Sequence, residues 1–240
     1  MSAVTLSAAG VKVTERTATS FGLRLLVATA LALPVASLSK TSFAQPVATC
    51  PTSRPEIAID LAIPEPEIDN ELTQPALQAL AGNAHHQGRT QGLYRVKLSA
   101  HAETAIEKAM RGDRACFRIT KVSVQITMIE RKIYITRKRR PGTCAFDAVL
   151  AHERKHQFLD DEILRARLPA VRGEIENAVV RLPPFAAAAA GQEGMMRARL
   201  GAAIHGALSH ALKTLEAERK LRQQEVDTPR EYRRVAAACG

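Results

Sequence analysis

Residues 149–164 read VLAHERKHQFLDDEIL and place a long helix in the second half of the chain. Apolar residues recur in and after this stretch at steps of three and four, the period of a helix with one buried face. His152 and His156 are four residues apart, so on a helix their side chains lie on one face, about one turn apart. The stretch therefore predicts a helix that presents two neighbouring imidazoles.

The helical pattern continues on both sides of this stretch. It begins after the turn at Pro141-Gly142, passes Pro169 as a kink or boundary, and stops at Pro183-Pro184. A second amphipathic stretch runs from about residue 192 to 224. Because only a short connection separates the two stretches, we expect them to pack as an antiparallel helical hairpin.

Before the helices, residues 92–138 show the alternation of apolar and polar residues that is typical of strands. The clearest stretches are 94–98, 122–128 and 133–135, whereas residues 101–111 fit either a helix or a strand. The predicted fold class is α+β, with a small antiparallel sheet followed by a long metal-binding helix and the hairpin.

Residues 1–44 are typical of a secretory signal peptide. They carry early basic residues, the apolar stretch LLVATALALPVASL at 25–38, and the small residues of Ser42-Phe43-Ala44. An uncleaved membrane anchor is the less favoured alternative, because Pro34 interrupts an apolar run already too short to span a bilayer. We therefore expect an exported protein, periplasmic or secreted, with no stable transmembrane span after processing.

The rest of the chain divides into two parts. Residues 45–91 are rich in Pro and polar residues and predict an extended arm. Residues 92–240 form the predicted domain, with the sheet in 92–138 and the helical part in 143–240.

The four cysteines all lie after the predicted signal peptide. They are Cys50, Cys116, Cys144 and Cys239. An even number of cysteines in an exported chain predicts two disulfides, and four cysteines can pair in three ways. Their scatter, without a C-x-x-C spacing, argues against a thiolate zinc site.

The chain has a formal net charge of +10, and residues 131–140 are its most basic segment. Such a segment could attract an anionic envelope surface, although a solvated sheet edge is the commoner explanation. Nucleic acid is disfavoured as a partner by export and by an aromatic content of only 4%.

His152, Glu153 and His156 form an H-E-x-x-H motif, HERKH. On a helix the two imidazoles can hold one Zn²⁺, which lowers the pKa of a bound water to about 7 and polarises a scissile carbonyl. Glu153 would take the proton of that water and pass it to the leaving amine. The motif predicts hydrolysis of a protein or peptide substrate.

A sheet, a turn and a helix bearing HERKH together resemble the zincin class of zinc metallopeptidases. Residues 122–161, with Cys144 eight residues before His152, are similar to exported bacterial zincin-like domains. The resemblance implies that His152 and His156 are zinc ligands and that Glu153 is the catalytic base.

Three zincin patterns offer a third ligand. The metzincin pattern points to Glu162, but Leu159 stands where that pattern has a helix-ending Gly. The gluzincin pattern takes a Glu from a following helix, at Glu174 or Glu176, although the surrounding residues match poorly.

The third pattern depends on the hairpin. With a turn near residue 187 and an equal rise per residue, the chain returns to the level of His156 near residue 218, so that 225–232 passes the metal helix. This segment offers Glu225 and Asp227, and Asp227 with Tyr232 resembles the Asp and Tyr of aspzincins. The same return would bring Cys239 near Cys144. A capping box that begins at Thr228 gives the alternative that Asp227 only precedes a helix.

The sequence thus predicts an exported zinc-dependent metallopeptidase, with Zn²⁺ held by His152, His156 and Asp227 and with Glu153 as base. The alternative is a non-catalytic, basic cell-envelope protein with a binding or structural role and a degenerate HExxH helix.

Overall fold

The computed structural model describes residues 7–8, 13–15, 54–82, 90–111, 114–182, 186–188 and 191–239. In chain order the elements are β1 (Ser7–Ala8), β2 (Val13–Glu15), β3 (Glu56–Ala62), β4 (Glu67–Asp69), α1 (Gln74–Ala81), β5 (Gly92–Arg111), β6 (Arg114–Ile135), α2 (Cys144–Arg181), β7 (Ala186–Ala188), α3 (Glu193–Val226) and α4 (Pro229–Ala237). Apart from β1 and β2, the predicted signal peptide lies outside the described residues.

The sheet is larger than expected and is not simply antiparallel. β5 and β6 form a long antiparallel pair, but β3 and β4 run parallel to β6, and β1 and β2 run parallel to β5. With β7 antiparallel to β6, the described residues form a sheet of seven strands. The expectation of a small antiparallel sheet is therefore wrong, because it left out the parallel strands that precede residue 92.

Two of those additional strands, β3 and β4, lie in residues 45–91, for which the sequence predicts an extended arm. Pro55 precedes β3, and Pro64 and Pro66 lie between β3 and β4, so the prolines flank the strands and remove no backbone donor from within them. Helix α1 follows, with the Thr73 hydroxyl accepting a hydrogen bond from the amide of Ala76 as its N-cap. The prediction relied on the high proline content of this segment and therefore missed these strands and helix α1.

Residues 101–111, which fitted either a helix or a strand, belong to β5. They pair with β6 nearly continuously, from His101 opposite Gln125 to Arg111 opposite Arg114. Pairing along the whole partner strand outweighs the helix propensity of the Ala and Glu residues in this segment.

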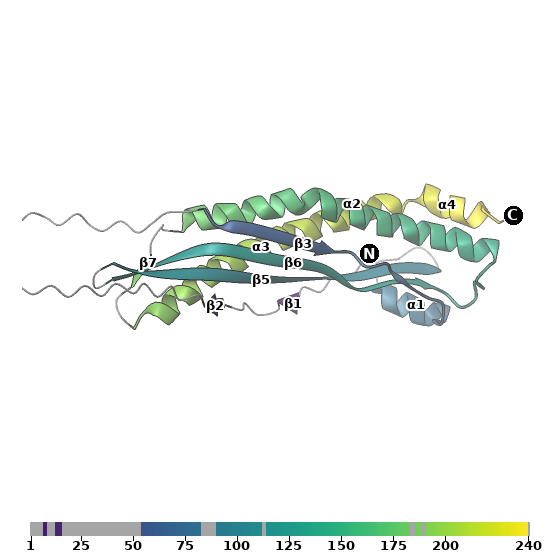
Figure 1. Cartoon of the computed structure of the whole chain (residues 1–240). Coiled ribbons are helices and arrows are strands. Elements are labelled where there is room, and N and C mark those ends of the chain that lie inside the picture. The colour runs from purple at the N-terminus through teal and green to yellow at the C-terminus, as the bar shows by residue number, and fades with distance from the viewer. Residues whose placement is uncertain are drawn as a thin grey trace, which may run out of the picture.

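The two long helices form the expected hairpin. α2 has 38 residues, begins after Thr143 as N-cap and continues through Pro169, and α3 has 34 residues. Their antiparallel course is visible in two side-chain contacts between them, which join Arg167 to Glu218 and Glu174 to His210. Both helices cover the same face of the sheet (Figure 1) and share its main hydrophobic core.

Arg131 shows that the basic segment is only partly a surface feature. The register of β5 and β6 shifts where Glu130 and Arg131 oppose Val96, and Glu130 has a positive φ of 51°. Such a bulge redirects the following side chain. Arg131 is buried, donates to the hydroxyl of Tyr94 and pairs with Asp161. An anionic envelope surface as partner stays a prediction.

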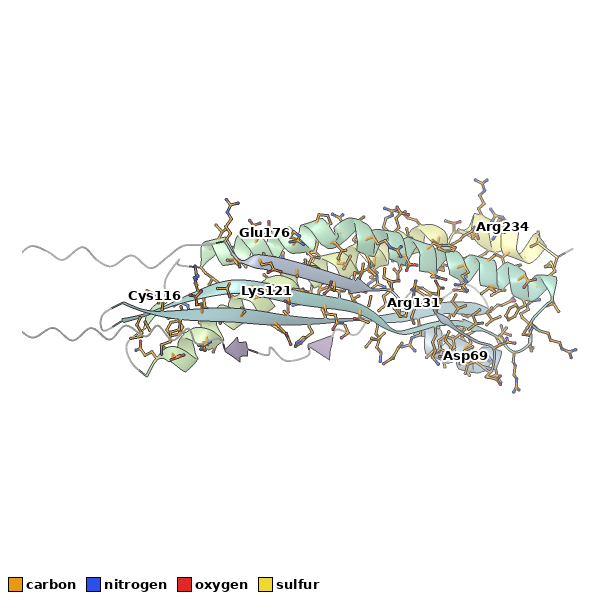
Figure 2. The ribbon with its side chains drawn as sticks, viewed as in Figure 1. Asp69, Cys116, Lys121, Arg131, Glu176 and Arg234 are labelled. Carbon is orange, nitrogen blue, oxygen red and sulfur yellow. A yellow bond between two sulfur atoms is a disulfide. The ribbon has the colours of Figure 1, made fainter. Side chains whose placement is uncertain are left out.

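Among the described residues, no helix has both the length and the apolar character needed to cross a bilayer. A disulfide joins Cys144, the first residue of α2, to Cys239, just beyond α4. This confirms the expectation that the returning chain brings these two cysteines together. Cys116 is disulfide-bonded as well, at the end of the sheet far from α4 and Arg234 (Figure 2).

We predict that replacing Cys144 and Cys239 together by Ser lowers the free energy of unfolding by about 2–4 kcal/mol. The disulfide closes a loop with a sequence separation of 95, and α4 has no buried residue of its own to keep it docked. Urea unfolding of the oxidised proteins measures the difference. An unchanged midpoint would mean that the disulfide does not restrain α4.

Candidate metal centre

The site lies between two rows of polar side chains on the facing helices. One row lies on α2 and consists of His152, His156 and Asp160, which are spaced four residues apart. The other row has the same spacing and consists of Arg219 and Gln223 on α3 and Asp227 at the end of that helix. Side chains four apart share one helix face. The antiparallel hairpin therefore places the rows opposite each other, as three facing pairs: Asp160 with Arg219, His156 with Gln223, and His152 with Asp227.

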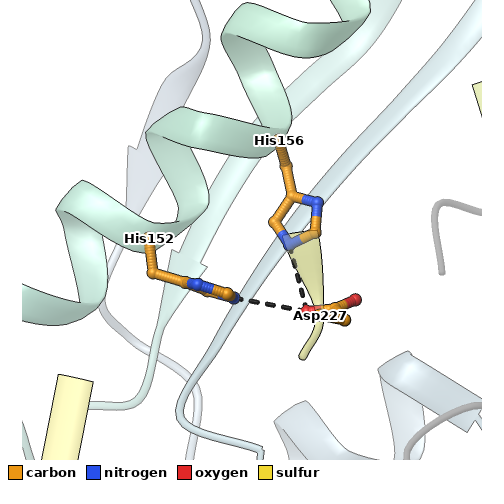
Figure 3. Close-up of side chains that lie close together, drawn as sticks. All are labelled: His152, His156 and Asp227. Carbon is orange, nitrogen blue, oxygen red and sulfur yellow. Dashed lines mark hydrogen bonds and ion pairs between the residues drawn. The ribbon is translucent and has the colours of Figure 1, made fainter. Parts of the chain in front are cut away.

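Three potential metal ligands converge at one end of these rows (Figure 3). Oδ1 of Asp227 lies 3.3 Å from Nε2 of His152 and 3.2 Å from Nε2 of His156. Both histidines are buried and Asp227 is half-buried. One ligand atom from each residue lies within 4.8 Å of the others, so the group could hold a metal ion.

The outer ring nitrogens of both histidines face hydrogen-bond acceptors. Nδ1 of His156 contacts Oε1 of Gln223, and Nδ1 of His152 lies 3.4 Å from Oε1 of Glu231, on α4. Lys155 and Arg234 hold the Glu231 carboxylate, and the hydrogen bond from Arg234 is the main reason that the pKa of Glu231 is lowered. Partners of this kind fix the orientation of metal-binding imidazoles.

The electrostatics of the group favour an ionised Asp227. Burial alone would raise the pKa of Asp227, but hydrogen bonds from His152, His156 and Tyr232 outweigh it and hold the pKa far below its usual range. The Tyr232 hydroxyl donates to Oδ1 of Asp227 at 2.8 Å. A carboxylate must be deprotonated to bind a metal, so Asp227 is already in the required form.

Glu153 is buried beside the group and next to the start of β5. Burial raises its pKa, while the nearby His156 and His152 oppose this rise, and the backbone amide of Tyr94 donates a hydrogen bond to its carboxylate. Gly92 makes room for it, because a Cβ at Gly92 would overlap the carboxylate and lie 2.6 Å from Cγ1 of Val149. Glu153 thus sits in a closely fitted place between α2 and the sheet.

The structure separates Asp227 from the other third-ligand candidates. Glu162, Glu176 and Glu225 are exposed, and Glu225 pairs with Arg222. Glu174 lies beside His210. Thr228 does cap α4, with its hydroxyl accepting from the amide of Glu231, so Asp227 both precedes a helix and joins the histidines.

Sequence reasoning missed four polar residues around the site: Asp160, Arg219, Gln223 and Glu231. The signal for two of them was present. The apolar stripe of α3 passes through Leu208, Leu212 and Leu215 and continues at the same spacing into Arg219 and Gln223. Polar residues that continue a buried stripe indicate a buried polar network.

Comparison with protein-family models, with curated proteins and with solved structures found no match for the chain.

We predict that Gly92→Ala destabilises the protein by about 1–3 kcal/mol, because the added methyl group overpacks the buried space held by Glu153. The matched control is Gly173→Ala in α2, where a Cβ meets nothing within 4 Å and is expected to stabilise the helix by about 0.5–1 kcal/mol. Thermal unfolding compares the two. Equal effects of the two substitutions would contradict this account of Gly92.

Proposed function

We propose that the protein is an exported zinc-dependent metallopeptidase that hydrolyses peptide bonds. The observation that carries the proposal is the convergence of two imidazole Nε2 atoms on one carboxylate oxygen, next to the buried carboxylate of Glu153. A three-ligand set of this kind leaves a coordination position open, which distinguishes a catalytic zinc site from a closed structural one.

The donor set supports zinc as the metal. Two imidazole nitrogens and a carboxylate oxygen are ligands that Zn²⁺ commonly takes, and no cysteine belongs to the group. The charges agree as well, because a divalent cation would balance the buried carboxylate of Glu153 and the half-buried carboxylate of Asp227. Among the described residues, the potential metal site is the group of His152, His156 and Asp227.

In the proposed reaction, His152, His156 and Asp227 would hold the zinc ion. The ion would supply Lewis-acid polarisation of the scissile carbonyl and make water acidic. Glu153 would accept a proton from the attacking water and deliver it to the leaving amine. Its raised pKa supports this role, because a base with a pKa nearer neutrality can both take up and release a proton.

Export is supported by the apolar stretch at 25–38 and by the disulfide between Cys144 and Cys239, which persists in an oxidising compartment.

The site is also held from several sides, by α2, by the end of α3 and by α4. A degenerate helix in a non-catalytic envelope protein would not require these matched contacts around both histidines.

We predict that the oxidised protein binds stoichiometric zinc and that Asp227→Ala lowers the zinc affinity more than about 100-fold. Loss of an outer partner of a ligand alone costs about 10–100-fold, and loss of the ligand itself should cost more. Glu225→Ala is the control, since Glu225 is exposed at the end of the same helix. Competition with a chromophoric chelator measures the affinities. Absence of zinc from the wild type would end the peptidase proposal.

We predict that Glu153→Gln retains zinc but lowers casein hydrolysis about 10²–10⁴-fold, the usual contribution of general acid–base catalysis. Glu162→Gln, an exposed glutamate on the same helix, should leave the rate unchanged. Initial rates on casein, with zinc content checked for each variant, provide the test. Full activity of Glu153→Gln would show that this carboxylate is not the base.

A further inference from the structure

A buried chain of polar contacts leads from Arg219 through Asp160 and Gln223 to His156. Nε of Arg219 donates to Oδ1 of Asp160 at 3.0 Å, and Nη2 donates to Oδ2 at 2.5 Å. The side chain of Asp160 is 0% exposed and that of Arg219 is 2% exposed. The proposed peptidase reaction gives these buried groups no task.

The contacts of Gln223 determine how its amide is oriented. Its Nε2 lies 2.9 Å from the backbone oxygen of His156 and 2.8 Å from Oδ1 of Asp160. A backbone carbonyl only accepts, and both oxygens of Asp160 already accept from Arg219, so the NH₂ group of the amide must point this way. Oε1 of Gln223 is thereby turned toward Nδ1 of His156.

This orientation selects one tautomer of His156. An acceptor beside Nδ1 requires a proton on Nδ1, since a neutral imidazole carries one N–H and one lone pair. Asp227 is a second acceptor, 3.2 Å from Nε2, so a protonated His156 donates to both residues. In the neutral ring, the shorter contact to Gln223 keeps the proton on Nδ1 and leaves the lone pair on Nε2. A metal ion between the two residues would then meet the Nε2 lone pair on one side and the ionised carboxylate of Asp227 on the other.

We propose that Gln223 is a positioning residue, which holds His156 in the tautomer with a proton on Nδ1 and so presents Nε2 to the metal. Asp160 and Arg219 fix the amide in the one orientation that does this. The inference rests on the proposed metal site and goes beyond it, because it assigns a role to residues that do not touch the metal. His152 has a longer contact to Glu231 at its Nδ1, so the control over His156 is the tighter of the two.

The test compares Gln223→Leu with Gln224→Leu in the full, oxidised chain. Gln224 is the adjacent, exposed glutamine on the same helix, so its substitution changes the same side chain without touching the polar chain. We expect Gln223→Leu to weaken zinc binding about 10–100-fold, the effect of removing an outer partner of a ligand, and Gln224→Leu to leave it unchanged. Competition with a chelator supplies these values.

The second readout is the tautomer itself. Long-range proton–nitrogen NMR correlations of the metal-free protein, at a pH above the titration of both imidazoles, identify which nitrogen of His156 carries the proton. The wild type and Gln224→Leu should show the proton on Nδ1, whereas Gln223→Leu should show a mixture or the other tautomer. A merely structural role for Gln223 would not produce this change.

The two readouts separate the failure of each proposal. If the wild-type protein binds no zinc but His156 carries its proton on Nδ1, the proposed metal site is wrong and the inferred orientation of His156 still holds. A wild-type spectrum with the proton on Nε2 would overturn the role of Gln223 even if Gln223→Leu did not fold. Unchanged zinc affinity in a folded Gln223→Leu would overturn it as well.

Discussion

The buried ion pair between Arg219 and Asp160 sets the register of the two long helices, and the metal-binding group depends on that register. Apolar stripes alone allow helices to slide by a turn, whereas a buried charge left without its partner costs about 3–5 kcal/mol. With Arg219 opposite Asp160, the same antiparallel spacing places Gln223 opposite His156 and Asp227 opposite His152. A slip by one turn would break all three contacts together.

Much of the site followed from local spacing in the sequence. The HERKH motif placed His152 and His156 on one helix face because helical geometry is regular, and the equal rise of two antiparallel helices brought the segment with Asp227 back to them. The contact of Cys239 with Cys144 followed from the same return of the chain. Periodicity therefore predicted the hairpin well, since each helix is long and its stripe repeats many times.

The sheet and the polar network around the site were harder to foresee. β3 and β4 are short strands flanked by prolines, and their parallel pairing with β6 depends on contacts between distant residues, which no local pattern reveals. The burial of Arg131 depends on a bulge at Glu130. The buried apolar residues do change from even positions, up to Met128, to odd positions, from Ile133 on, but this change does not show that the bulge turns Arg131 inward. Gln223 could have been found, because it continues the apolar stripe of α3, but its partner could be named only from the packed helices.

The direct test of the metal centre is the zinc X-ray absorption spectrum of the purified, oxidised protein. The account predicts nitrogen and oxygen neighbours at about 2.0–2.2 Å, the multiple-scattering signal of two imidazoles, and no sulfur neighbour. A sulfur shell, or an imidazole count other than two, would contradict the assignment of His152, His156 and Asp227 as the ligands.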